Sequence, residues 1–521
     1  MKKKIMFKNL SDEDKQQLIE IYHRKDLTWD ERTDLARSIF NVTERRIRVW
    51  WVKLGCKTKK DSIPEQYEIA KGKKLNENKQ VFFVTWGQNN TKVHKELFEN
   101  MKAYAEVRNA SIHVIAGRYK NPTSVNADAK YEFWANELLP YLDANRHKVH
   151  DRLHVLSDIK IQPTATNPMS GMEGVSGSDC CVFGSPKVHL EAIPSLGDSM
   201  PKLMLTTGAC TVKNYTDSKA GKKGEFHHTL GFVIIELDGE HFHVRQVTAS
   251  NDGSFYDLIY HVKNQLCLYN NSCSAIVLGD IHVGDTCPSL MRATRQLLDK
   301  IKPDRTVIHD LFNGESISHH DSKDPIRQYQ KEKKGTNSLD REIKLMKIWI
   351  ESMKRYNLVV VRSNHDDWID RWICNVDWKK DIKNSYEYIT YTKALLDGNA
   401  PKGIIPYIID NTFNDVITLD RDESFIVNGW ELGVHGDIGQ HGMKGSPLQF
   451  RRLNSKMITG HGHSPIRKDG FLQVGTSTKR RVGYNKGASN WMNSHVIVYP
   501  NGKAQHIHLT NKKFSTIWDT K

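Results

Sequence analysis

The sequence predicts an α/β protein of several domains, with a small all-α domain at its N-terminus. Short apolar runs of strand length alternate with helix-like segments from residue 81 to 161, and again from residue 274 onward. This alternation is the pattern of β-α-β units. A chain of 521 residues is also too long for one ordinary core. We therefore expect two to four domains.

The composition is that of a globular protein of an aqueous, reducing compartment, with 38% apolar and 26% charged residues. No stretch approaches the roughly 18 consecutive apolar residues of a membrane span. Residues 1–17 are basic but lack an apolar segment of signal-peptide length. The eight cysteines are scattered without a C-x-x-C pair, which favours free thiols. We expect a cytoplasmic protein that does not associate with membranes.

The charge of the chain indicates a polyanionic partner. The formal net charge is +15. Residues 1–80 hold 20 Lys and Arg against 13 Asp and Glu, so this short segment supplies +7 of the total. Net charge reports attraction rather than function. Its concentration at one end nevertheless favours a dedicated binding module there.

Helices are predicted within residues 11–25, 28–39 and 43–55, and this arrangement makes residues 1–58 resemble a DNA-binding helix-turn-helix domain of the homeodomain-like or transposase kind. Thr28 and Glu31 form a capping box that starts a helix. A short turn follows, and a last helix runs from Thr43 to Gly55. The last helix of such a domain lies in the major groove. The alternative is a three-helix module that docks protein. The expected DNA contacts are the outward basic residues Arg45, Arg46, Arg48 and Lys53.

Residues 59–80 are polar and Lys-rich and are interpreted as a linker with at most one short helix. Residues 81–268 are predicted to form an α/β domain of unknown role. Residues 219–226 would contact phosphates or form a solvated loop. A metal site is conceivable there, but the exposed face of a strand explains the pattern better; its candidate side chains are Glu225, His227, His228, His241 and His243.

From residue 274 onward, five predicted strands each end in side chains that bind metals. Ligands of open α/β sheets lie just beyond the carboxyl ends of the strands. One such residue is most often a helix cap or a turn residue, but five in chain order make coincidence improbable. In that order the five strand ends carry Asp280 with His282, Asp310, Asn364 with His365 and Asp366, His435, and His461 with His463.

These strand ends resemble the five sequence blocks of the calcineurin-like metallophosphoesterase superfamily. The motifs are GDIH, HDLFNGE, SNHD, VHGD and GHGH, and the similarity covers roughly residues 275–510. The resemblance implies a four-layer αββα sandwich with two metal ions, which we assign to residues 272–515. It further implies that Asp310 bridges the two metals. One metal would be held by Asp280, His282 and His463, and the other by Asn364, His435 and His461.

The same ligand set suits particular ions and a particular reaction. Carboxylate, amide and imidazole ligands without cysteine fit Mn²⁺ best, with Fe²⁺, Zn²⁺ or Mg²⁺ as alternatives. His365 would act as general acid or stabilise the transition-state charge, with Asp366 fixing its tautomer. Asp366 could instead cap the following helix. Two departures from the blocks, His309 and Ser363 in place of glycine, remove no ligand.

We therefore expect a two-metal phosphoesterase that hydrolyses the phosphodiester bonds of DNA. The alternatives are a phosphatase or nucleotide phosphodiesterase with a protein-docking N-terminal module, and a DNA-binding regulator whose phosphoesterase fold is inactive. The charge distribution argues against the first alternative, and the complete ligand series argues against the second.

The combination of domains also resembles the DNA-degrading phosphoesterases that some tailed phages make early in infection, which implies the host cytoplasm as the location. Asn313 stands where the SbcD-type branch has His, so membership of that branch is not assigned. DNA is the expected partner and a homo-oligomer the expected assembly. A partner ATPase, which the SbcD type uses, has no support in the sequence.

Overall fold

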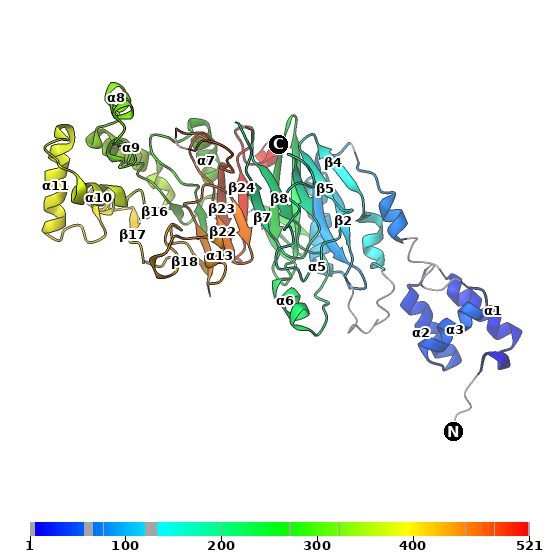
Figure 1. Ribbon diagram of the computed structural model, residues 1–521. Coiled ribbons are helices and arrows are strands. Elements are labelled where there is room, and N and C mark those ends of the chain that lie inside the picture. Colours follow the sequence, from blue (N-terminus) through cyan, green and yellow to red (C-terminus); the bar gives the residue numbers. More distant parts are fainter. Residues whose placement is uncertain are drawn as a thin grey trace.

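The structure is a computed structural model in which the N-terminal helices stand apart from a large body of sheets (Figure 1). It describes residues 6–24, 26–56, 66–76, 78–119, 133–197, 199–269, 272–321, 323–453, 455–483 and 485–518. The N-terminal part holds three helices: α1 (Asp12–His23), α2 (Trp29–Phe40) and α3 (Glu44–Lys53).

The three N-terminal helices form where their sequence starts and stops them. The capping box predicted at Thr28 and Glu31 is present, and a second one at Ser11 starts α1. Asn41 ends α2 with a left-handed φ of 50°, which makes the short turn into α3. Trp51 of α3 is buried and donates its indole N–H to the carbonyl of Leu18, 2.7 Å away. This bond and the aromatic packing fix α3 across α1.

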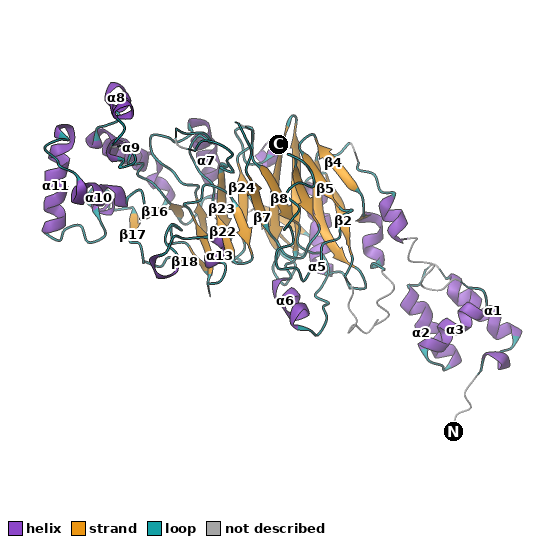
Figure 2. Ribbon diagram, viewed as in Figure 1, coloured by secondary structure: helices purple, strands orange, loops and turns teal. Residues whose placement is uncertain are grey.

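Part of the predicted linker lies outside the described residues, namely 59–65 and 77. Residues 66–71 are helical, as the prediction of one short helix allowed. In its described residues, the body that follows is built from four sheets, with helices at its periphery (Figure 2).

A five-stranded sheet comes first, in the order β10-β9-β1-β2-β3. Its strands are β1 (Val81–Gln88), β2 (Ala110–Gly117), β3 (Leu142–Asp143), β9 (Gly231–Asp238) and β10 (His241–Thr248). Helix α5 (Lys95–Val107) crosses over between the parallel strands β1 and β2 and buries Leu97, Met101 and Tyr104 against the sheet. A small sheet of β11 (Phe255–Asp257), β12 (Tyr260–Lys263) and β13 (Leu266–Tyr269) packs beside it.

A six-stranded sheet has the order β17-β16-β15-β14-β23-β24. Its strands are β14 (Ala275–Val277), β15 (Thr306–Ile308), β16 (Leu358–Val361), β17 (Ile417–Leu419), β23 (Ser494–Val498) and β24 (Ala504–His508). The helices around it are α7 (Pro288–Ile301), α8 (Pro325–Lys334), α9 (Leu339–Met353), α10 (Asp367–Asn375), α11 (Ser385–Leu396) and α12 (Ile404–Asp410). Asn501 and Gly502 lie in the turn between β23 and β24, which pair as an antiparallel hairpin, and β23 also pairs with β14.

A ten-stranded sheet faces both smaller sheets, in the order β18-β19-β20-β22-β21-β7-β8-β6-β5-β4. One half is β4 (Arg146–His150), β5 (Leu153–Leu156), β6 (Cys180–Phe183), β7 (Leu190–Ile193) and β8 (Lys202–Thr206). The other is β18 (Ile426–Val427), β19 (Trp430–Glu431), β20 (Lys456–Thr459), β21 (Ile466–Lys468) and β22 (Phe471–Gln473). The short helices α6 (Lys219–His227) and α13 (Pro447–Phe450) flank it.

The two halves of the ten-stranded sheet bury separate cores. Val277 and Val359 of the six-stranded sheet pack in one cluster with Ile458 of β20. Val84 of the five-stranded sheet packs in another cluster with Val182 of β6. The division into domains at 268 and 272 stays a prediction, but the ten-stranded sheet contains strands from both sides of it.

The two halves also repeat one topology. The order β3-β2-β1-β9-β10 matches β16-β15-β14-β23-β24, and β4-β5-β6-β8-β7 matches β18-β19-β20-β22-β21. Each matched pair of neighbours has the same parallel or antiparallel sense. The halves meet where β7 pairs antiparallel with β21. The body therefore holds two copies of one arrangement, side by side and joined through equivalent edge strands.

Candidate metal centre

The predicted ligands come together where strands of two sheets end. Asp280 and His282 follow β14, Asp310 follows β15 and Asn364 follows β16, all in the six-stranded sheet. In the ten-stranded sheet, His435 follows β19, and His461 and His463 follow β20. All but Asn364 and His461 are buried. Their convergence follows from parallel strands that end at a common edge.

The orientation of several of these side chains depends on an unusual conformation of the backbone. The φ angles of His282, Asp310, His461 and His463 are 45°, 47°, 68° and 56°. Residues other than glycine rarely adopt this left-handed region, and each instance costs about 1–3 kcal/mol. Such strain persists only where the surrounding packing enforces it. Here it turns four polar side chains away from their strands and toward one point.

One group of ligand atoms gathers around Asp280. The Nε2 atom of His463 lies 3.1 Å from Asp280 Oδ2 and 3.1 Å from His282 Nε2. His282 Nε2 is in turn 3.4 Å from Asp310 Oδ2. These four residues are the expected ligands of the first metal together with the expected bridge.

A second group shares Asp310 with the first. Its Oδ2 atom lies 3.4 Å from His435 Nε2. The side-chain oxygen of Asn364 is 2.9 Å from His435 Nε2 and 3.2 Å from His461 Nδ1. Asp310 is thus the common member of both groups, as a bridging ligand must be. The individual roles as ligands stay predictions.

The chemistry of the cluster fits a divalent cation. Asp280 Oδ1 and Asp310 Oδ1 are buried and have no hydrogen-bond partner among the described residues. Leaving a buried carboxylate oxygen unpaired costs free energy that a cation would recover. The His282 and His463 Nε2 atoms also face each other, and a single proton can satisfy only one of them as donor. This buried Asp/His cluster can therefore bind a metal.

The carboxylates control protonation of the cluster. Burial opposes the charged form of His463, but Asp280 and Asp310 outweigh it and raise its pKa to about 9. Burial likewise opposes the charged form of His435, and Asp310 raises its pKa to about 9. Burial would raise the pKa of Asp310, but His435, His282 and His365 hold it well below the usual value. Metal-free protein therefore keeps protons on imidazoles that a metal would need.

His365 lies beside the cluster, with its ring centre 4.5 Å from that of His282. Its Nδ1 atom is 2.7 Å from the carbonyl of Asn313, which can only accept, so the proton of the neutral ring sits on Nδ1. Burial lowers the pKa of His365 to about 3. Its Nε2 is then unprotonated, so the expected role as general acid would require a second proton. Trp368 stacks on the ring at 4.1 Å.

Asp366 does not take either expected role. Its carboxylate accepts hydrogen bonds from the backbone and hydroxyl of Ser363, at 2.9 and 3.0 Å. The carbonyl of Asn313 therefore orients His365 in its place, and Asp366 makes no side-chain cap to α10. Burial, and then the charge of Asp310, raise the pKa of Asp366 to about 7. Its side chain tightens the loop between β16 and α10.

Further residues line the centre without having been recognised in the sequence. His309 is buried, and its ring centre lies 5.5 Å from that of His435. The indole of Trp491 lies 4.0 Å, centre to centre, from the ring of His463. A pocket of about 230 Å³ beside Trp491 is lined by Lys479, Arg480 and Arg481. The run of three basic residues after β22 was the signal that could have indicated this opening.

The loop that carries His319 and His320 approaches the centre through Trp368. The ring centres of His319 and His320 lie 5.3 and 5.6 Å from that of Trp368, which stacks on His365. Asp285, in contrast, accepts a hydrogen bond from Asn313 at 3.2 Å and belongs to neither ligand group. It serves the loop that leads into α7.

The remaining candidate residues lie elsewhere. Arg45 and Lys53 are exposed on α3, while Arg46 and Arg48 are half-buried and Arg48 pairs with Glu44. DNA contact by these residues stays a prediction.

The histidines of residues 81–268 belong to neither ligand group found among the described residues. His228 is instead bonded to Tyr215 and to the carbonyl of Thr211.

Comparison with known proteins places the chain among phage proteins. Protein A1 of Escherichia phage T5 is 30% identical over 480 residues, which cover 87% of this chain and 84% of that protein. The chain belongs to the protein A1 family. No family model matches the sequence. The crystal structure of Chaetomium thermophilum Vps29 aligns with 33% of this chain and 90% of that chain, at 10% identity and a TM-score of 0.20, too low to support an inference.

This membership indicates a phage origin, and the cluster adds a site that can hold metal. None of the described helices combines the length and the apolar character needed to cross a bilayer.

We predict that Asp310→Ala removes metal from both groups at once, because Asp310 contributes to each. Bound Mn²⁺ after dialysis, measured by mass spectrometry, should fall by about tenfold or more, since even outer partners of metal sites contribute 10–100-fold. Asp285→Ala is the matched control and should retain metal. Equal metal content in both variants would contradict the bridging position.

We also predict that metal binding releases protons. Both His435 and His463 have a pKa of about 9 without metal, so they are protonated at pH 7.5, whereas metal ligands must be deprotonated. Affinity should therefore weaken as pH falls below about 9. Calorimetric titration with Mn²⁺ in two buffers of different ionisation enthalpy measures the release. Identical heats in both buffers would show that no proton leaves.

Proposed function

We propose that this protein is a DNA nuclease that hydrolyses phosphodiester bonds with two divalent metal ions, of which Mn²⁺ fits best. The observation that carries the proposal is the pair of ligand groups that share Asp310 Oδ2, at 3.4 Å from both His282 and His435. A single shared carboxylate is what a two-metal site requires. The four-layer metallophosphoesterase sandwich and the helix-turn-helix are parts of the same proposal.

The metal pair would supply Lewis acidity and a clamp on the attacking and leaving oxygens of an in-line displacement. The chain supplies the positioning. Asn313 holds His365 through Nδ1, which leaves Nε2 to contact a phosphoryl or leaving oxygen when protonated, or to accept a proton when neutral. Trp368 stacks on the same ring and restricts its rotation.

A polyanionic substrate is favoured by the surroundings of the centre. Lys479, Arg480 and Arg481 line the opening next to Trp491, which contacts His463. Cations placed at the mouth of a site attract a phosphate backbone and steer it inward. A small phosphoester carries fewer negative charges and would gain less from them. The exposed basic residues of α3 would add contacts to the DNA backbone at a distance from the chemistry.

The decisive experiment incubates pure protein with plasmid and with linear duplex, in Mn²⁺, in Mg²⁺ and in EDTA. The proposal expects cleavage with Mn²⁺ and none with EDTA. A small phosphodiester serves as the parallel substrate. Turnover of that compound without cleavage of DNA under any metal would replace the nuclease with a phosphatase or nucleotide phosphodiesterase.

His365→Ala should slow the chemistry while leaving the metals bound. His365 lies beside the cluster but belongs to neither ligand group. We expect kcat to fall by about 10²–10⁴-fold, the usual contribution of a positioned acid or base. Metal content is measured on the same sample. Loss of metal equal to that of Asp310→Ala would assign His365 to the ligand shell and not to catalysis.

The triple variant Arg45→Gln, Arg46→Gln and Lys53→Gln should bind duplex DNA less tightly and with a flatter salt dependence. Each lost phosphate contact lowers the slope of log K against log salt by about 0.9. Arg37→Gln on α2, also an exposed cation, is the control. Fluorescence anisotropy across a salt series gives the slopes. A slope unchanged from that of the wild type would make the N-terminal helices a protein-docking module.

A further inference from the structure

The two copies of the fold can be aligned residue by residue through their backbone hydrogen bonds. Asp280 donates to the carbonyl of Gly475 and accepts from the amide of Ser477. Trp86 makes the same two bonds, with Gly208 and Cys210. Asp280 and Trp86 therefore occupy equivalent positions at the ends of β14 and β1.

The equivalence extends to the helix that follows. Cys287 is the N-cap of α7 and bonds through its amide to Ser477, and His94 is the N-cap of α5 and bonds in the same way to Cys210. Strand β6 pairs with β8 in the same register as β20 pairs with β22. This register places Gly184 of the first copy at the position that Gly460 holds in the second. The ligand positions of His461 and His463 then fall on Ser185 and Lys187.

The first copy has filled its own ligand site with an indole ring. A Cβ on Gly460 would lie 2.3 Å from Asp280 Oδ1, and a Cβ on Gly184 would lie 2.9 Å from Cδ1 of Trp86. Both glycines thus make room for the residue at the same position. Trp86 is 1% exposed. The first copy keeps the architecture of the metal centre but not its ligands.

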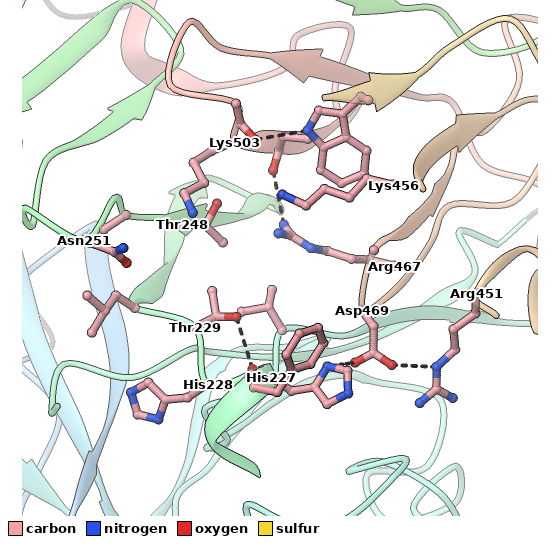
Figure 3. Close-up of a pocket in the computed structure, with 18 of the residues that line it drawn as sticks. His227, His228, Thr229, Thr248, Asn251, Arg451, Lys456, Arg467, Asp469 and Lys503 are labelled. Carbon is pink, nitrogen blue, oxygen red and sulfur yellow. Dashed lines mark hydrogen bonds and ion pairs between the residues drawn. The ribbon is translucent and has the colours of Figure 1, made fainter. Parts of the chain in front are cut away.

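A pocket of about 1220 Å³ lies between the two copies (Figure 3). From the first copy it is lined by His94, His228 and residues next to them. From the second copy it is lined by the starts of β19 and β20 and by the turns after β21 and β23. None of the predicted metal ligands lines it.

This pocket has a counterpart beside the metal centre. The small basic opening there is lined by Lys479, Arg480 and Trp491 of the second copy and by the β7–β8 connection of the first. Trp491 stands three residues before β23, as His228 stands three before β9, and the β21–β22 turn replaces the β7–β8 connection. The repeat therefore gives the molecule two related openings, of which the larger one has no chemistry assigned.

The lining of the larger pocket is strongly basic. Its Lys and Arg side chains number six against one carboxylate, Asp469; they are Lys213, Arg451, Arg452, Lys456, Arg467 and Lys503. Asp469 is already bonded to His189 at 3.2 Å and to Arg451 at 2.5 Å, and it lies 3.1 Å from His227. Its charge is thus used within the wall and does not neutralise the opposite side.

The opposite wall carries cations without acidic partners. Among the described residues, no carboxylate forms an ion pair with Arg467, Lys503 or Lys456. Arg467 is 7% exposed, bonds only to the carbonyl of Ala504 at 3.2 Å, and leaves its Nε without a partner. Burial lowers its pKa to about 10 and, with neighbouring cations, lowers that of Lys503. Figure 3 shows Lys503 and Arg467 on the same side of the pocket, across from Asp469 and His227.

Of these three cations Arg467 is buried, Lys503 is half-buried and Lys456 is exposed. A buried cation without an acidic partner is costly, and an anionic ligand removes that cost. The volume exceeds the usual 300–1,000 Å³ of small-molecule pockets, so it admits more than a bare anion. Phe226 of α6 is 81% exposed at the lining and offers a face on which a base can stack.

We propose that this pocket is a second, non-catalytic site that binds a terminal phosphate group, carried by a nucleoside monophosphate or present as free phosphate. Arg467, Lys503 and Lys456 take the phosphate, and Phe226 lies against the base when one is attached. This ligand class matches the product of DNA hydrolysis, but the proposal rests on the pocket and not on the nuclease function.

Calorimetric titration of the full-length protein in EDTA tests the site without metal or cleavage. The probes are dAMP, inorganic phosphate and deoxyadenosine. We expect dAMP to bind, deoxyadenosine not to bind, and Lys503→Gln to weaken dAMP by about tenfold, the loss of one charge-assisted contact. Lys380→Gln, an exposed lysine outside the pocket, is the matched control and should bind as the wild type does. Lys456→Gln and a thermal melt keep the test valid if Arg467→Gln fails to fold.

Phe226→Ala separates the two sources of phosphate. If it weakens dAMP but not inorganic phosphate, the ligand is a nucleotide; if phosphate binds as tightly as dAMP in the wild type, it is free phosphate. Either result supports the site. Absence of binding by both probes, or equal binding by Lys503→Gln and wild type, overturns it. So does dAMP binding that is lost in Asp310→Ala but kept in Lys503→Gln, because the ligand would then sit at the metal centre.

Discussion

The buried charge of Asp310 is the constraint on which the half of the molecule with the metal-ligand cluster depends. Its carboxylate is 1% exposed and stands within ion-pair distance of three histidines from three loops. A buried carboxylate is tolerated only when cations surround it. The ends of β14, β15, β16, β19 and β20 are brought together around this one group, and the sheets behind them are apolar on both faces. A divalent cation bound by these residues would add to the positive charge that the histidines place around Asp310.

The candidate site could be predicted from the sequence because the ends of buried strands can be recognised in it. An apolar run followed by Asp or His predicts both the strand and the position of the side chain at its carboxyl end. The role of Asp366 was not readable, because its neighbour Ser363 captures the carboxylate through backbone and hydroxyl bonds that depend on the loop. The left-handed backbone at His282 and His463 could not be predicted either, because histidine adopts this region more often than most residues but still only in a small minority of cases.

The repeat could not be predicted from the sequence, for a related reason. The motifs that mark the second copy are its ligands, and the first copy has exchanged them, Asp280 being matched by Trp86. What remains shared is topology, which no run of residues records. The two copies join through equivalent edge strands. β7 and β21 pair edge to edge, and Lys468 of β21 forms an ion pair with Glu191 of β7 at 3.1 Å. Each copy covers an edge strand that would otherwise be open to other chains.

Because Trp86 replaces a ligand in the first copy, the two copies differ in how they affect the stability of the fold. In the second copy, polar groups and left-handed residues occupy the end of the sheet, an arrangement that lowers the stability of the fold. In the first copy, the same place holds a large apolar ring packed against glycines, which favours folding unconditionally. Because both copies share one sheet, the first can act as an internal template on which the strained copy assembles. The first copy thus contributes stability to the fold, whereas the second carries the cluster that can bind metal.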